Sequence, residues 1–140
     1  MMTDRFGKGD IVGYPYLWRW QEEEGREHGE KDRPVCLILS KRDDKGNTHV
    51  LLLPISATPP FEGQAALEIP TLELQRAKLS TFKRGWITVS ECNYDILEKS
   101  FHFDTRQKPR GKFSGLFLEG VRKAFAPFLA AGSARVDRTR

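Results

Sequence analysis

The sequence predicts a small, mainly β domain of the α+β class, in which antiparallel strands form a barrel. Two unbroken apolar runs, in the stretches 33–40 and 50–56, are typical of strands that are buried on both faces, and they predict strands over 34–40 and about 48–56. Further short runs, rich in β-branched and aromatic residues, are separated by turn residues. A long stretch near the C-terminus has apolar residues at helical spacing. Together these features indicate a small barrel with a terminal helix over one face or end.

The chain has 140 residues, and we expect one domain over 1–132 followed by a basic tail over 133–140. No apolar run approaches the length of about 18 residues that a membrane helix needs. The polar start of the chain has no signal-peptide pattern, which predicts a cytoplasmic protein. Cys36 and Cys92 lie in apolar runs, so we expect buried thiols rather than a disulfide or a metal pair.

The first half of the chain contains the strands that we expect to organise the sheet. A strand is predicted over 11–18, with Pro15 at a sheet edge or a bulge because it has no N–H to donate. A polar loop without apolar periodicity follows over 19–32. The two buried runs come next and are joined by a hairpin turn over 42–47.

The second half of the chain predicts shorter elements. In chain order they are a strand over 65–70, a helix over 71–78, strands over 86–92 and 100–104, and a helix over 115–130. We expect Thr71 and Ser114 to cap the two helices and Gly132 to end the second.

Charge is distributed unevenly along the chain, although the net charge is only +4. Residues 21–32 carry six acids against two bases, a net of −4, and residues 76–140 carry fourteen bases against six acids, a net of +8. Such an asymmetry indicates a polyanion or an acidic protein as partner, and a solvated charged surface is the alternative.

The two buried runs also predict a polar site. If they pair as antiparallel neighbours, the start of the first and the end of the second lie at the same edge. Arg33 stands at that start and Ser56 at that end. The alternative is that Arg33 is a surface arginine paired with Asp32 or Glu30, and that Ser56 is a turn residue.

The order of four short motifs resembles the PemK/MazF family, the toxin components of bacterial toxin–antitoxin pairs. The motifs are Gly9-Asp10-Ile11-Val12, Gly25-x-Glu27, Arg33-Pro34 before a hydrophobic strand ending at Ser40, and Pro54-Ile55-Ser56. The resemblance covers about residues 7–95. It implies an SH3-like barrel of antiparallel strands with a short helix and a C-terminal helix, and a homodimer.

The resemblance also implies an activity. Members of this family are endoribonucleases that cut single-stranded RNA without a metal or other cofactor and are neutralised by an acidic antitoxin. The resemblance implies that Arg33 and Ser56 lie at the active site. Metal-free cleavage uses the RNA 2′-hydroxyl as nucleophile and needs a cation beside the phosphate and groups that move protons. Arg33 would supply the charge, and Ser56 would orient the phosphate or relay a proton.

Four residues form the predicted RNA-binding surface: His28, Lys31, Lys83 and Arg84. An imidazole such as that of His28 titrates near neutral pH and can act as acid or base, although a solvated loop histidine is the commoner case. We expect His49 and His102 to face outward from strands. Histidines and cysteines show no ligand spacing, so no metal site is predicted.

Two departures from the family pattern favour other functions. The loop before Arg33 is long and acidic, and the family's Arg-Thr-Ile-Asp-like segment is replaced by Asn93-Tyr94-Asp95-Ile96. One alternative is a non-catalytic module that binds a protein, as the related CcdB toxins bind gyrase, or binds DNA or RNA without cutting. Another is a remnant of the family that folds and dimerises and does little else.

Overall fold

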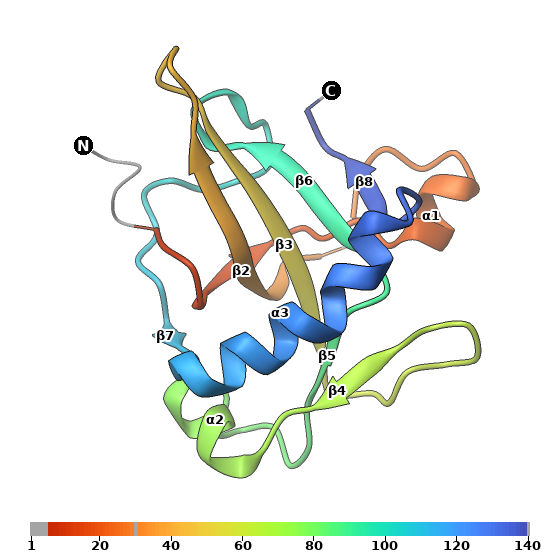
Figure 1. Cartoon of the computed structure of the whole chain (residues 1–140), viewed down its shortest axis with the longest axis vertical. Helices are drawn as coiled ribbons and strands as arrows, with labels where there is room; N and C mark the ends of the chain where they lie inside the picture. Colours follow the sequence, from red (N-terminus) through yellow and green to blue (C-terminus); the bar gives the residue numbers. More distant parts are fainter. Residues whose placement is uncertain (1–5, 30, 140) are drawn as a thin grey trace.

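The computed structural model of the chain describes residues 6–29 and 31–139. Within this part, an eight-stranded sheet curls into a small barrel that carries a C-terminal helix (Figure 1). The pairings in it are antiparallel, apart from the parallel pairing of β6 with β8. The predicted fold class is therefore confirmed.

Strand β3 (Thr48–Ser56) lies at the centre of this sheet. Along one edge it pairs with β2 (Arg33–Arg42) in the register Val35↔Pro54 to Arg42↔Thr48. Along its other edge it pairs first with β6 (Cys92–Ile96) and then, at its end, with β5 (Trp86–Thr88). The predicted antiparallel pair of buried strands is thus confirmed, and every other strand is placed relative to it.

The remaining strands extend the sheet on either side of this pair. They are β1 (Asp10–Tyr14), β4 (Ala66–Glu68), β7 (Gly111–Lys112) and β8 (Arg135–Asp137). The strand order is β4-β5-β3-β2-β1-β7, and β8 is attached to β6. Because β3 has β2 on one edge and two strands in succession on the other, the sheet bends around it.

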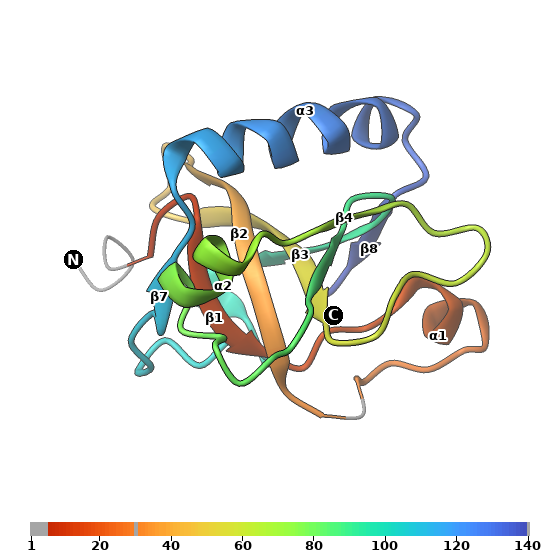
Figure 2. The ribbon, with the colours of Figure 1, turned by 90° about the horizontal axis from the view of Figure 1, so that it is seen from below.

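In the part of the chain that the structure describes, three α-helices and one 3₁₀-helix connect or cover these strands. They are α1 (Arg19–Glu23), α2 (Thr71–Arg76), η2 (Leu97–Lys99) and α3 (Gly115–Ala130). Figure 2 shows α3 lying across one side of the sheet. Ser114 caps α3 as predicted, because its Oγ accepts the N–H of Phe117 at 3.2 Å. The predicted cap of the other helix is wrong, since Pro70 precedes α2 as its N-cap.

Side chains alternate along β2 and β3, so each strand contributes to a core on both sides of the sheet. The helix-side core lies between the sheet and α3 and includes Cys36, Ile38, Leu51, Leu53, Val121 and Phe125. The far-side core lies on the opposite face and includes Val12, Tyr14, Tyr16, Val35, Leu37, Val50, Leu52 and Phe103. Both cysteines are buried and free, as predicted.

The predicted strand over 11–18 is wrong in its second half, because β1 ends before Pro15. Side chains hold the chain there instead of a strand partner. Asn93 accepts the N–H of Leu17 at 2.9 Å and donates to its carbonyl at 2.7 Å. Arg138 Nη1 donates to the Pro15 carbonyl at 2.9 Å. The backbone groups after β1 are therefore satisfied by two buried polar side chains.

The predicted strand over 100–104 is also wrong, because a turn lies there. Ser100 Oγ accepts the N–H groups of His102 at 3.0 Å and Phe103 at 2.8 Å. Phe101 is 81% exposed and Phe103 is 6% exposed, so the alternation that suggested a strand comes from this turn.

The predicted strand over 86–92 divides into two. Strand β5 ends at Thr88 and β6 begins at Cys92. The segment 93–96 lies within β6, and its Asn93 and Asp95 are fully buried. These two residues therefore belong to the buried interior of the sheet.

Two segments predicted to lack structure contain elements. The predicted tail over 133–140 contains β8, and Arg138 after it is 2% exposed, while Arg140 lies outside the described residues. The predicted loop over 19–32 begins with α1. Gln21 Oε1 accepts the N–H of Trp18 at 3.0 Å, which fixes the first turn of that helix. Glu30 in this loop also lies outside the described residues.

Candidate functional site

Arg33 begins β2 and is the cross-strand neighbour of Tyr14 on β1. Cross-strand neighbours point to the same side of a sheet, so the Arg33 side chain lies on the side of the far-side core. Its guanidinium carbon lies 5.2 Å from the centre of the Trp18 ring, and that ring packs edge to face on Tyr16 with centroids 5.1 Å apart. This stacking fixes a positive charge at the open end of the far-side core.

Ser56 ends β3 and is the cross-strand neighbour of Trp86 on β5. Its Oγ accepts the N–H of Thr58 at 3.0 Å, and the side chain is half-buried. Counted along β3, Ser56 shares its side with Val50 and Leu52, which is the side of the far-side core.

Arg33 and Ser56 lie at the same end of the β2–β3 pair, and both side chains are on the same face of the sheet. The register of that pair ends at Val35↔Pro54, two residues short of each. Beyond that point β2 stays paired with β1 and β3 pairs with β5, each along its other edge. One cation and one hydroxyl therefore lie at this end of the strand pair.

Lys83 and Arg84 precede β5 and are both exposed, close in sequence to the strand that pairs with Ser56. Arg84 binds the Glu68 carboxylate through two hydrogen bonds of 2.8 Å and lies 4.8 Å over the Trp86 ring. The bonds from Arg84 hold the pKa of the Glu68 carboxyl below its ordinary value. An RNA phosphate at Arg84 would therefore compete with a carboxylate, whereas Lys83 forms no ion pair with any residue among 6–29 and 31–139.

His28 lies in the loop before β2 and lines a pocket of about 300 Å³. Its ring centre is 5.9 Å from that of His102, which reaches the pocket from the turn after η2. Gly29, next to His28, lets the loop pass close to the backbone of Tyr16, because a Cβ at residue 29 would lie 2.5 Å from the Tyr16 carbonyl oxygen. His102 was predicted to face outward from a strand, and the structure instead brings it to His28.

Lys31 is exposed and lies two residues before β2. The acidic segment 21–32 that surrounds it is also exposed from Glu22 to His28. Arg26 in this segment pairs with Glu24 at 3.3 Å and lies over the Trp20 ring at 5.2 Å. The segment therefore presents carboxylates next to every predicted RNA-binding residue that precedes β2.

A buried polar network lies under the pocket and was not predicted from the sequence. The Asp95 carboxylate accepts hydrogen bonds from the Tyr14 hydroxyl at 2.8 Å and the Ser100 hydroxyl at 2.5 Å. Burial, together with the nearby carboxylate, raises the pKa of Tyr14 above its ordinary value, so this phenol stays protonated. Asp95 and Tyr14 are both fully buried, and only the strand assignment of β6 could have indicated that they meet.

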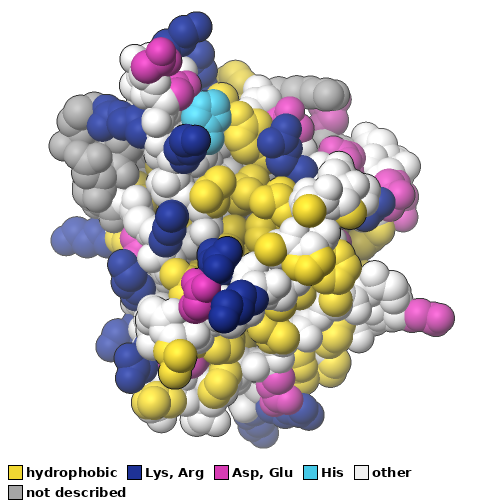
Figure 3. Space-filling model, viewed as in Figure 1, with side chains coloured by type: hydrophobic (Ala, Val, Ile, Leu, Met, Phe, Trp, Pro, Cys, Tyr) yellow, Lys and Arg dark blue, Asp and Glu magenta, His cyan; other side chains and the backbone are white. Residues whose placement is uncertain are grey.

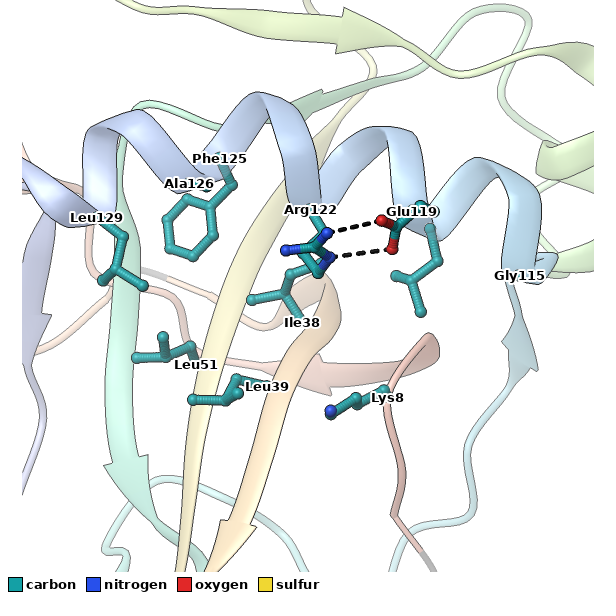
Figure 4. Close-up of a pocket in the computed structure, with 11 residues that line it drawn as sticks. Lys8, Ile38, Leu39, Leu51, Gly115, Glu119, Arg122, Phe125, Ala126 and Leu129 are labelled. Atoms are coloured by element: carbon teal, nitrogen blue, oxygen red, sulfur yellow. Dashed lines mark hydrogen bonds and ion pairs between the residues drawn. The ribbon is translucent and has the colours of Figure 1, made fainter.

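An apolar groove lies on the other side of the sheet, between α3 and β2 (Figure 4). It has a volume of about 430 Å³, and Ile38, Leu39 and Leu51 line its floor. The β-bulge between Leu37 and Leu39 is what turns two successive side chains of β2 toward it. Figure 3 shows hydrophobic side chains gathered on this face of the molecule, with charged ones between them.

Among residues 6–29 and 31–139 no group of three or more histidine, cysteine, aspartate or glutamate side chains is arranged to bind a metal ion. The helices in the same part of the chain are too short or too polar to cross a membrane.

Glu91, beside α1, provides a pH test of these buried polar groups. It is 5% exposed, and its Oε1 accepts hydrogen bonds from the Tyr16 hydroxyl at 3.1 Å and the Arg19 N–H at 2.9 Å. Burial raises the pKa of the Glu91 carboxyl above its ordinary value of 4.5. The free energy of unfolding therefore falls as pH rises from 4.5 to the raised pKa of Glu91 in the folded protein. Over that interval Glu91 is ionised in the unfolded chain and still protonated in the folded one.

We expect Glu91→Gln to increase the free energy of unfolding at neutral pH, because the amide keeps the Oε1 acceptor and removes the buried charge. The gain over wild type should shrink toward about pH 3, where Glu91 is protonated in both states. Urea unfolding at the two pH values measures it. A gain that is equally large at both, or a loss at neutral pH, contradicts this account of Glu91.

Comparisons with protein-family models, with curated proteins and with solved structures find no match to this chain. The likeness to the PemK/MazF toxins therefore depends on the order of the sequence motifs and on the fold class alone.

Proposed function

We propose that the protein is a metal-independent endoribonuclease of the PemK/MazF kind, a cytoplasmic growth-inhibiting toxin that cuts single-stranded RNA. The observation that carries this proposal is the position of Arg33 and Ser56, at the same end and on the same side of the central β2–β3 pair. The resemblance expects those two residues at the active site, and the predicted fold class supports the same reading.

The proposed reaction needs a cation beside the scissile phosphate. Arg33 is suited to this, because its guanidinium is held against Trp18 and can form two parallel hydrogen bonds to phosphate oxygens. Ser56 then orients a phosphate oxygen through its hydroxyl. A hydroxyl is a poor base at neutral pH, so the proton transfers depend on other groups.

The RNA strand would run from Arg33 and Ser56 toward Lys83 and Arg84. Trp86, the cross-strand neighbour of Ser56, is 8% exposed and is covered by Arg84, so the two cations rather than this ring would contact the strand. On the other side of Arg33 the acidic segment 21–32 repels the phosphate backbone.

The proposed partners follow from charge and from the apolar groove. An acidic antitoxin segment would bind the basic half of the chain, which has a net charge of +8 over 76–140. A second copy of the chain would cover the groove between α3 and β2. Its floor is apolar, and its rim carries Lys8 together with the Glu119–Arg122 ion pair, so two copies related by a two-fold axis would bury the apolar floors against each other.

A non-catalytic binding module on the same barrel is the second candidate. The acidic segment directly before Arg33 favours it, because carboxylates beside the site oppose the binding of a polyanion. In that case the same end of the barrel would bind a protein, or would bind nucleic acid without cutting it.

Arg33→Ala tests the proposed nuclease. Purified wild-type protein should cut single-stranded RNA in the presence of EDTA, and the variant should cut about 100- to 1,000-fold more slowly, because a transition-state cation is lost. Arg135→Ala is the matched control, since Arg135 also stacks on an aromatic ring, at 4.5 Å from the Tyr94 centroid, but lies on β8. Equal cutting by wild type and Arg33→Ala would refute the site.

Wild-type protein that binds RNA or a protein partner and leaves RNA intact in the same assay favours the binding module. Circular dichroism and thermal unfolding of both arginine variants show whether a loss of cutting comes from the site or from unfolding.

Leu39→Asp tests the proposed dimer. Leu39 is 37% exposed in the groove, so a carboxylate there would be buried between two copies and should shift the protein to a monomer in sedimentation velocity. Leu72→Asp is the control, because Leu72 is 56% exposed on α2, away from the groove. A wild-type protein that sediments as a monomer, or a Leu39→Asp variant that stays dimeric, contradicts the proposed interface.

A further inference from the structure

The pocket at His28 contains a set of groups that the motif order does not indicate. His28 comes from the loop before β2, His102 from the turn after η2, and Arg138 from the residue after β8. These residues are far apart in the sequence, and all three line the same cavity of about 300 Å³. The ring centres of the two histidines are 5.9 Å apart, so both imidazoles face one small volume.

Arg138 forms a fixed positive charge at the base of this pocket. Its Nη1 donates to the Pro15 carbonyl at 2.9 Å and to Asn93 Oδ1 at 3.0 Å, and its guanidinium lies 5.4 Å from the centre of the Tyr14 ring. The side chain is 2% exposed. Its Nη2 is buried and has no hydrogen-bond partner within the described part of the chain. A buried guanidinium N–H without an acceptor is costly, and an anion in the pocket would reduce that cost.

The pocket and Arg33 belong to one side of the sheet. Tyr14, the cross-strand neighbour of Arg33, has its ring centre 6.4 Å from that of His102. Leu17 lines the pocket, and the next residue, Trp18, carries the stacked guanidinium of Arg33. The proposed phosphate cation and the two imidazoles are therefore neighbours across β1 and the segment after it.

We propose that His28 and His102 are the acid–base pair of the RNA cleavage, with the scissile phosphodiester bound beside the two imidazoles, between Arg33 and Arg138. This inference depends on the proposed function and supplies the proton transfers that Arg33 and Ser56 cannot perform.

The step balances without any further reactant. The 2′-oxygen attacks phosphorus, and its proton passes to one imidazole, which must be neutral at the start. The bond from phosphorus to the 5′-oxygen breaks, and the other imidazole, protonated at the start, gives its proton to that leaving oxygen. The products are a 2′,3′-cyclic phosphate and a 5′-hydroxyl. Arg138 stabilises the negative charge that develops on the phosphate oxygens.

Other charged groups also face the two imidazoles. They are Glu22, Arg26, Glu27, Asp137 and Arg138 on the wall of the pocket, and the Tyr14 phenol beside His102. The carboxylates oppose a bound phosphate, and Arg138 favours it. Arg26 is partly neutralised by its ion pair with Glu24.

The first test is binding, and it does not require any cleavage. Inorganic phosphate is titrated into the wild-type protein while the imidazole Cε1–H resonances are followed by NMR. We expect saturable shifts of the His28 and His102 signals. The signal of His49 should not move, because that ring is on β3, bonded to Tyr94 at 2.7 Å and Asp43 at 2.9 Å. Unmoved His28 and His102 signals overturn the inference.

The second test is kinetic. His28→Ala and His102→Ala should each lower the cleavage rate by about 100- to 10,000-fold, and the bell-shaped pH–rate profile of wild type should lose one limb in each variant. His49→Ala is the control, with an unchanged rate and profile. His102→Asn keeps a polar side chain of similar size and shows whether the loss comes from the imidazole or from packing.

The outcomes separate the two proposals. A wild-type protein that cuts RNA, with both variants as fast as wild type, overturns the acid–base pair and leaves the nuclease standing. A wild-type protein that does not cut RNA overturns the nuclease together with this catalytic role. In that case the phosphate titration decides whether the pocket is an anion site.

Discussion

The pairing of β2 with β3 is the constraint on which the rest of the structure depends. Both strands are buried on both faces, so a slip of one residue would exchange the helix-side core with the far-side core. That register is therefore strongly specified. It also fixes the side on which Arg33 and Ser56 lie, two residues beyond the end of the pair. The position of the proposed site is thus a consequence of core packing rather than of any contact between these two side chains.

Buried polar side chains complete the barrel where regular pairing stops. Pro15 ends β1, and Asn93 and Arg138 bind the backbone that follows it. The same segment carries Leu17 and Trp18, which contact the histidine pocket and Arg33 respectively. The irregular chain after β1 consequently joins the two parts of the proposed active site. The hydrogen bonds from Asn93 and from Arg138 Nη1 hold this segment in place beside the site.

The sequence predicted the fold class, the central strand pair and the C-terminal helix, because each of these has a strong hydrophobic pattern or a cap of its own. It did not predict β8 or β6 beyond Cys92, since Asn93, Asp95 and Arg138 are polar residues that are buried only through their partners. His102 was assigned to a strand because Phe101 and Phe103 alternate with polar residues, whereas Ser100 folds that segment into a turn. The sequence accordingly predicted the site residues at the strand ends, Arg33 and Ser56. It did not predict His102 and Arg138, which only tertiary contacts bring to the site.

The central claim is that RNA binds on the far-side face, at the end of the barrel where β2 begins. NMR shift mapping with a single-stranded RNA that carries 2′-deoxyribose at every position where cutting would occur tests it directly, because the ligand stays intact. The account predicts that the backbone signals of Tyr14, Trp18 and Arg33 shift on binding, while those of Val121 and Phe125 under α3 do not. Shifts confined to the α3 groove, or no shifts at all, would contradict it.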